Sequence, residues 1–252
     1  MKSIIEVKEE YNNSIDKEAE KIAELYLKDN MITYNVLSFI HQLYSSAKLN
    51  QYDNEQFASA YHNPITSDVE FYISRIIFHI IKKKELNWKI SLRKQKNKCA
   101  PDIRIDYNNE TKFIIEIKVK AGWIQQIFSR KRYEHDMKRY EENLIDVSPD
   151  KRVTEVRNQF DKYQKAFNIG SSKIFVLVST LSDVHRKKYD YLNVNDYKHS
   201  FIRHTDLPFN NLVVLSNNLN IDISKEENIS IYEPSSDLEK MLDTIFGSST
   251  RS

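Results

Sequence analysis

The N-terminal part of the chain has apolar residues at helical spacing. They fall into two groups: Ile15, Ala19, Ile22 and Leu25, then Val36, Phe39, Ile40 and Leu43. Residues three and four positions apart lie on one face of an α-helix, so this pattern predicts two helices between about Ser14 and Gln51. A polar stretch follows and ends at Asn63-Pro64, where we expect a boundary.

A third helix is expected over about Val69–Lys84. Its apolar stripe consists of Val69, Ile73, Ile76, Ile77 and Ile80. Such a stripe favours packing of one helix face on a core. Glu70 would then lie in the first turn, where a carboxylate is favoured by the helix dipole.

Alternation of apolar and polar residues then predicts three strands. They cover Trp88–Arg93, about Asp102–Asp106 and Phe113–Lys120, and Tyr107–Glu110 is the turn of a β-hairpin between the last two. Alternation divides the third strand between two faces of a sheet. One face takes Phe113, Ile115, Ile117 and Val119, and the other takes Ile114, Glu116, Lys118 and Lys120.

The second half of the chain predicts further helices and strands. We expect a charged helix over Trp123–Leu144. A second helix is opened by Ser148-Pro149, runs to about Phe167 and can be closed by Gly170. The apolar run Lys173–Val178 is typical of a strand covered on both faces. Leu212–Leu215 and Ile229–Tyr232 are expected to be strands, and Ser236–Phe246 a terminal helix.

This order of elements predicts an α/β protein with a mixed central sheet flanked by helices. We divide it into an N-terminal helical region (1–62), a core (63–204) and a C-terminal part that completes or extends the core (205–252).

Composition excludes several classes of protein. Three scattered glycines rule out a glycine-rich nucleotide-binding loop, and a single cysteine rules out an internal disulfide. The absence of a long apolar run or a signal-peptide pattern leads us to expect a cytoplasmic protein without membrane contact.

The formal net charge of +2 conceals a strong local asymmetry. Residues 82–139 contain 17 Lys and Arg against 7 Asp and Glu, so the remainder of the chain is acidic. A basic segment of this kind favours a polyanionic, phosphate-bearing partner. Solvated surface lysines are the plainer interpretation.

Three residues of the expected hairpin carry the candidate chemistry. Asp102 opens one strand and Glu116 lies on its partner, so their carboxylates can converge on a hard divalent cation such as Mg²⁺. Lys118, two residues further, shares the face of Glu116 and can orient a water or offset charge on a phosphate. The alternative is that these three residues only form salt bridges between two strands and have no catalytic role.

The residues Pro101-Asp102 and Glu116-Ile117-Lys118 resemble the signature of the PD-(D/E)xK nuclease superfamily, which has the restriction-endonuclease-like fold. Two further elements match. Glu70 lies in a helix before the first core strand, where family members often carry an acidic ligand. Gln159 and Tyr163 form a Gln-x-x-x-Tyr element similar to that of RecB-like nucleases.

The resemblance implies roles for these residues. Glu70, Asp102 and Glu116 would be ligands of Mg²⁺, with Mn²⁺ as a substitute and the Ile117 carbonyl as an extra ligand. Gln159 and Tyr163 would support the site or face the substrate, and Lys120 would contact phosphate.

Asp106 shares the face of Asp102 and is a candidate to replace it or add a ligand, although its place near the turn suggests solvent. The insertion of about 40 residues between Lys118 and Gln159 departs from a compact family member.

The resemblance thus implies a metal-dependent nuclease that hydrolyses phosphodiester bonds in DNA, with RNA as the less favoured hypothesis, and a role in restriction, phage defence, repair or mobile-element processing. A homodimer or a protein partner is also expected, through the terminal regions. The main alternative is a catalytically inactive nucleic-acid-binding or assembly module with the same fold. An unrelated α/β interaction protein is a third hypothesis.

Overall fold

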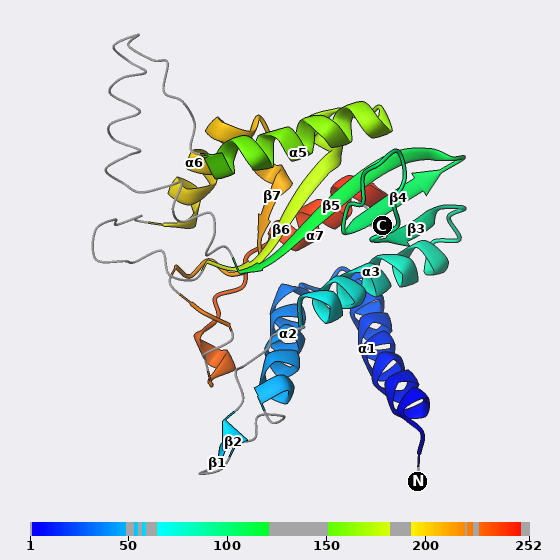
Figure 1. The fold of residues 1–252 in the computed structure, drawn as a ribbon, viewed down its shortest axis with the longest axis vertical. Coiled ribbons are helices and arrows are strands. Elements are labelled where there is room, and N and C mark those ends of the chain that lie inside the picture. The colour runs from blue at the N-terminus through cyan, green and yellow to red at the C-terminus, as the bar shows by residue number, and fades with distance from the viewer. Residues whose placement is uncertain are drawn as a thin grey trace.

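The computed structural model describes residues 2–48, 53–54, 57–58, 65–120, 151–181, 193–219, 221–223 and 227–247. A mixed β-sheet lies between two helical layers, with α5 (Lys151–Phe167) and α6 (Val194–Thr205) on one side and the helices of residues 4–83 on the other (Figure 1). No helix in these parts of the chain has the length and apolar character needed to cross a membrane.

Three helices form the N-terminal layer: α1 (Ile4–Leu27), α2 (Thr33–Lys48) and α3 (Ile65–Lys83). The first helix starts about ten residues earlier than its apolar pattern predicts. Ser3 explains the difference, because its hydroxyl accepts a hydrogen bond from the amide of Glu6 while Glu6 caps the amide of Ser3. A two-residue pairing of β1 (Asp53–Asn54) with β2 (Phe57–Ala58) lies between α2 and α3.

The sheet has the order β3-β4-β5-β6-β7. Its members are β3 (Lys89–Leu92), β4 (Ile103–Tyr107), β5 (Glu110–Lys120), β6 (Ile174–Thr180) and β7 (Leu212–Val214). The first three strands are antiparallel, whereas β5, β6 and β7 run parallel. The hairpin turn is tight because Asn108 and Asn109 both adopt left-handed backbone angles, with φ of 50° and 65°. The α/β class and mixed sheet are confirmed.

Two hydrophobic cores lie on the two faces of this sheet. Ile115 and Ile117 pack with α1, α2, α3 and α7 (Asp237–Phe246), whereas Ile114 and Val176 pack with α5 (Lys151–Phe167) and α6 (Val194–Thr205). All seven residues of β6 are buried, as expected of a strand covered on both faces. The alternation predicted for β5 is therefore confirmed from Phe113 to Ile117.

Three expectations about the second half were wrong. Ile229–Ile231 is a 3₁₀ turn rather than a strand, because Asn228 caps it by accepting a hydrogen bond from the amide of Ser230. Helix α6 was not foreseen at all. Helix α5 ends at Phe167 as predicted, but Asn168, whose φ is 54°, terminates it, and Gly170 instead precedes a short 3₁₀ turn.

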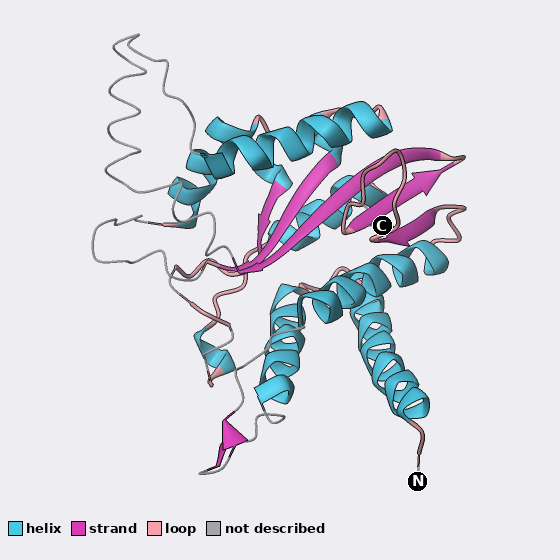
Figure 2. Ribbon diagram, in the orientation of Figure 1, coloured by secondary structure: helices cyan, strands magenta, loops and turns pink. Residues whose placement is uncertain are grey.

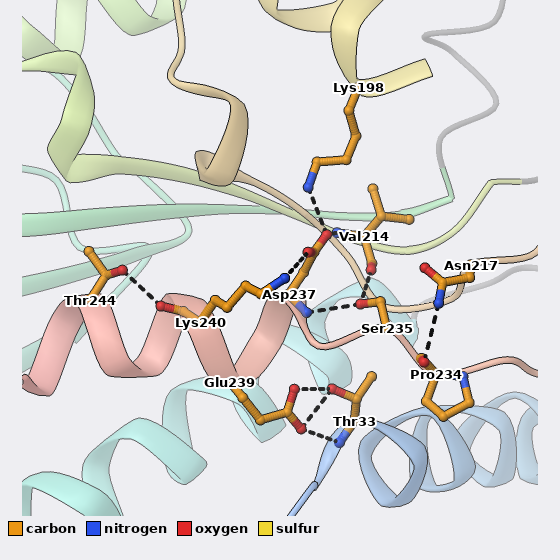
Figure 3. A network of polar contacts seen from close by, with 10 residues as sticks. All are labelled: Thr33, Lys198, Val214, Asn217, Pro234, Ser235, Asp237, Glu239, Lys240 and Thr244. Atoms are coloured by element: carbon orange, nitrogen blue, oxygen red, sulfur yellow. Dashed lines mark hydrogen bonds and ion pairs between the residues drawn. The ribbon is translucent and has the colours of Figure 1, made fainter. Parts of the chain in front are cut away.

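A polar network joins α7 to the rest of the fold (Figure 3). The buried ammonium of Lys198 on α6 lies 2.9 Å from Oδ2 of Asp237. Two residues on, the Glu239 carboxylate accepts hydrogen bonds from the amides of Ile32 (2.7 Å) and Thr33 (2.9 Å) and so caps α2. Helix α7 is thus tied to a helix of each layer, α6 and α2.

Candidate functional site

The β4–β5 hairpin opens at Asp102, where the backbone pairing of the two strands ends. From this point the Asp102 side chain bonds to the partner strand. The register of β4 with β5 runs from the turn to Ile103 opposite Ile115. Just beyond it, Oδ2 of Asp102 accepts a hydrogen bond of 2.8 Å from the amide of Ile117. Asp102 is thereby fixed against the segment of β5 that carries Glu116.

Glu116 connects β5 to helix α5. Its side chain is buried, and Oε1 accepts a hydrogen bond of 2.6 Å from the Tyr163 hydroxyl. Tyr163 in turn accepts one of 2.7 Å from Nε2 of Gln159. Lys118 Nζ lies 3.4 Å from the other Glu116 oxygen. The predicted Glu-x-Lys and Gln-x-x-x-Tyr residues therefore belong to one connected group.

Glu70 reaches this region from the opposite helical layer. Because α3 begins at Ile65, Glu70 lies in its second turn rather than the first, and Asp68 is the first-turn acid. Only 1% of Glu70 is exposed. Glu70 is therefore not a solvated carboxylate at a helix terminus. The Arg93 guanidinium pairs with it, with Nη2 2.5 Å from Oε1 and Nε beside Oε2. Oε2 still lacks a well-aligned hydrogen-bond donor.

The electrostatics indicate that these groups influence one another. Burial raises the pKa of the Glu116 carboxyl, and the charge of Asp102 raises it further, while Lys118 and Tyr163 act in the opposite direction. Burial likewise raises the pKa of Glu70, against the hydrogen bond from Arg93, and Asp102 again adds to the rise. Burial and the adjacent Glu116 carboxylate raise the pKa of Tyr163, which stays a hydrogen-bond donor.

Arg93 is the residue of this site that the sequence did not reveal. Its backbone lies in the left-handed region with φ of 47°, and its amide donates to the carbonyl of Asp102 at 2.9 Å. The hydrogen bond to Glu70 raises the pKa of Arg93, and the charges of Asp102 and Glu116 contribute. In the sequence Arg93 is one of several cations in a basic loop, and only its adjacency to the end of a strand sets it apart.

Asp106 does not belong to this group, and the expectation that it faces solvent was wrong. It is buried, with Arg104 Nε at 3.0 Å and the Thr111 hydroxyl at 2.8 Å. A register shift between Ile105 and Asp106 places Thr111 opposite it. With its oxygens used in this way, Asp106 is unsuited to replace Asp102.

The remaining predicted features are placed only in part. Lys120 pairs through its backbone with Thr180, and its side chain lies outside the described residues. The same is true of the whole of the predicted helix Trp123–Leu144 and of the predicted cap Ser148-Pro149. The Ile117 carbonyl remains a predicted ligand.

Within the described parts of the chain, no three His, Cys, Asp or Glu side chains are already arranged as a metal site. No protein-family model, curated protein or solved structure matches this chain. A function for the site is therefore inferred from the chemistry of its own residues.

Proposed function

We propose that the protein is a metal-dependent nuclease that hydrolyses phosphodiester bonds in DNA. The observation that carries the proposal is the linkage of Asp102, Glu116, Lys118 and Tyr163 where the β4–β5 hairpin opens. Residues that are distant in sequence and match a nuclease signature contact one another or the same strand. A salt-bridged strand pair would not require the additional hydrogen bonds from α5.

The topology also supports a restriction-endonuclease-like fold. Three antiparallel strands continue into parallel strands through β5, and helices cover both faces (Figure 2). We assign this arrangement to the restriction-endonuclease-like fold, with α3 supplying Glu70 from the layer opposite α5.

The donor atoms fit a hard divalent cation such as Mg²⁺. Glu70, Asp102 and Glu116 offer carboxylate oxygens, the ligands that Mg²⁺ prefers. Among the described residues, Oδ1 of Asp102 has no hydrogen bond, and Oε2 of the buried Glu70 has no well-aligned donor. A bound Mg²⁺ would polarise the phosphate and lower the pKa of a bound water.

The protein's own residues would then prepare the reaction. Asp102 is oriented by the Ile117 amide, and Glu116 by the Tyr163 hydroxyl, so each carboxylate presents a defined oxygen. Lys118 is partly exposed beside the buried Glu116, and its ammonium would orient the attacking water or offset the charge developing on the phosphate. The exposed Lys94 of the β3–β4 loop would attract the polyanionic strand.

The test is cleavage of linear and circular DNA, with RNA as a third substrate, in Mg²⁺ or Mn²⁺. We expect Asp102→Ala and Lys118→Ala each to reduce cleavage by at least about 100-fold, as loss of positioned electrostatic groups does. Lys112→Ala is the matched control, because Lys112 lies on the same strand but outside the site. Its ammonium pairs with the Glu110 carboxylate at 2.9 Å. It should retain full activity.

Two results would contradict the proposal. Cleavage that persists in both site variants would assign the activity to a contaminant. No cleavage by the wild-type protein, combined with DNA binding that neither substitution alters, would instead support the inactive binding module.

A further inference from the structure

A second polar feature lies beside the candidate site, at the outer strands of the sheet. A pocket of about 410 Å³ is bounded by β3, β4 and the β4–β5 turn. All nine residues that line it are polar. Four are cations, namely Lys89, Lys94, Lys96 and Arg104, against the single carboxylate of Asp106. The lining therefore favours a polar, negatively charged ligand.

The floor of the pocket is rigid and its one carboxylate is already neutralised. The buried Arg104 contacts both oxygens of Asp106 through Nε, at 3.2 and 3.0 Å. Its Nη1 donates to the carbonyl of Lys94 at 3.1 Å. Thr111 supplies a further hydrogen bond to Asp106. Because these bonds hold Arg104 and Asp106 together, the charge of the floor is close to zero.

The rim is therefore positively charged. Among the described residues Lys89, Lys94 and Lys96 form no ion pair, and Lys96 Nζ instead donates to the carbonyl of Asn109 at 3.0 Å. Asn87, Asn108 and Asn109 add side-chain amides around the same opening. Cations without an acidic partner, beside amide donors, favour an anion with several acceptor oxygens, as a phosphate group has.

The pocket is connected to the candidate site by one loop. Arg93 and Asp102 close this loop, and Lys94 within it lines the pocket. Asn97 anchors the loop to α5 through the carbonyl of Ala166. From Asp102 to Asp106 an extended strand advances by about 13 Å. At about 3.4 Å per nucleotide of a stacked strand, this distance is roughly four nucleotides.

We propose that this pocket binds a backbone phosphate of the nucleic-acid strand, about four nucleotides from the bond that is cleaved. The inference rests on the proposed nuclease function and adds a positioning contact to it. The pocket would set the register of the strand on the site through charge, without reading bases.

The experiment measures DNA binding over a range of salt concentrations in the presence of a chelator, so that no cleavage is needed. The variant is Lys89→Gln/Lys94→Gln, which leaves the floor intact. Its matched control is Lys82→Gln/Lys98→Gln, which removes the same charge from exposed lysines of α3 and of the same loop that do not line the pocket. Thermal unfolding establishes that both variants are folded.

For the pocket variant we expect about tenfold weaker binding and a salt slope smaller by about one to two units, as loss of one or two phosphate contacts gives. The control should change affinity by less than about threefold. Equal losses in both variants would overturn the proposal, since they would indicate only diffuse attraction. An unchanged pocket variant would overturn it as well.

Inorganic tripolyphosphate distinguishes a strand phosphate from a free one. Stabilisation of the wild-type protein by tripolyphosphate, lost in the pocket variant while DNA binding stays unchanged, would assign the pocket to a free polyphosphate and overturn the strand contact. Failure of the nuclease proposal is seen separately, as absence of cleavage by the wild-type protein in Mg²⁺.

Discussion

The guanidinium of Arg93 lies against both carboxylate oxygens of Glu70, the buried acid that we propose as a metal ligand. Arg93 comes from a loop and its side chain is half exposed, whereas Glu70 is held within a helix. The pair therefore places a movable cation on a fixed carboxylate.

Arg93→Ala should strengthen the binding of Mn²⁺, because the ion would no longer compete with Arg93 for Glu70. Loss of a charged hydrogen bond of about 1.5 kcal/mol corresponds to roughly tenfold in affinity. Calorimetric titration without DNA measures the change. Lys98→Ala, which removes an exposed cation of the same loop, is the control and should change affinity little. Unchanged or weaker binding in Arg93→Ala would contradict this competition.

Tyr163→Phe should reduce cleavage while leaving the fold intact. It removes the hydroxyl that orients Glu116, and loss of a group that orients a metal ligand typically costs about 10–100-fold. Tyr26→Phe is a close control, since Tyr26 donates a comparable hydrogen bond of 2.7 Å to Asp243, outside the site. Equal activities of the two variants would show that the Tyr163 hydroxyl has no part in the reaction.

Metal binding should become tighter as pH rises. The pKa values of Glu70 and Glu116 are raised, mainly by burial, so each carboxyl keeps its proton above the ordinary value of 4.5 and must release it to bind a cation. In the metal-free protein a raised carboxyl pKa stabilises the fold below the unfolded-state value, and this contribution is lost as pH rises through the folded-state value. Mg²⁺ should therefore raise the unfolding temperature more at about pH 8 than at about pH 5. A pH-independent effect of Mg²⁺ would argue against ligands with raised pKa values.

Lys198→Met should lower the free energy of unfolding by about 3–5 kcal/mol, because it leaves Asp237 as a poorly exposed carboxylate without its buried partner. Lys240→Met tests the same carboxylate from outside. Lys240 is largely exposed and lies 4.0 Å from Asp237, so its loss should cost less than about 0.5 kcal/mol. Denaturant unfolding measures both. Similar costs for the two substitutions would exclude burial as the source of the effect.

Much of the sheet and of the candidate site followed from periodicity and spacing. Alternation along β5 predicted that Glu116 and Ile117 point to opposite faces, and the two cores confirm it for the apolar neighbours Ile114 and Ile115. The same alternation placed Glu116 toward the helix that carries Tyr163, and the hydrogen bond between them agrees with that placement.

The failures arise from caps, a register shift and a loop contact, which apolar periodicity does not encode. Ile229 and Ile231 alternate with polar residues as in a strand, but a cap from Asn228 bends the segment into a 3₁₀ turn. Asp106 was expected to face solvent because it lies near the turn. A register shift, which spacing does not reveal, places Thr111 opposite it. Arg93 was hidden for a related reason: its contact with Glu70 joins a loop to a helix 23 residues earlier.

The capping of α2 by Glu239 has a consequence for the order in which the protein is made. The amide of Thr33 meets its acceptor only after the ribosome has added 206 further residues. Every candidate site residue from Glu70 to Tyr163 is synthesised earlier, yet α7, which fills the core beneath the sheet with Leu238, Met241 and Leu242, comes later. A nascent chain that stops before α7 thus carries all the acidic groups without the layer that supports them. The proposed activity would arise only after α7 has emerged from the ribosome and docked.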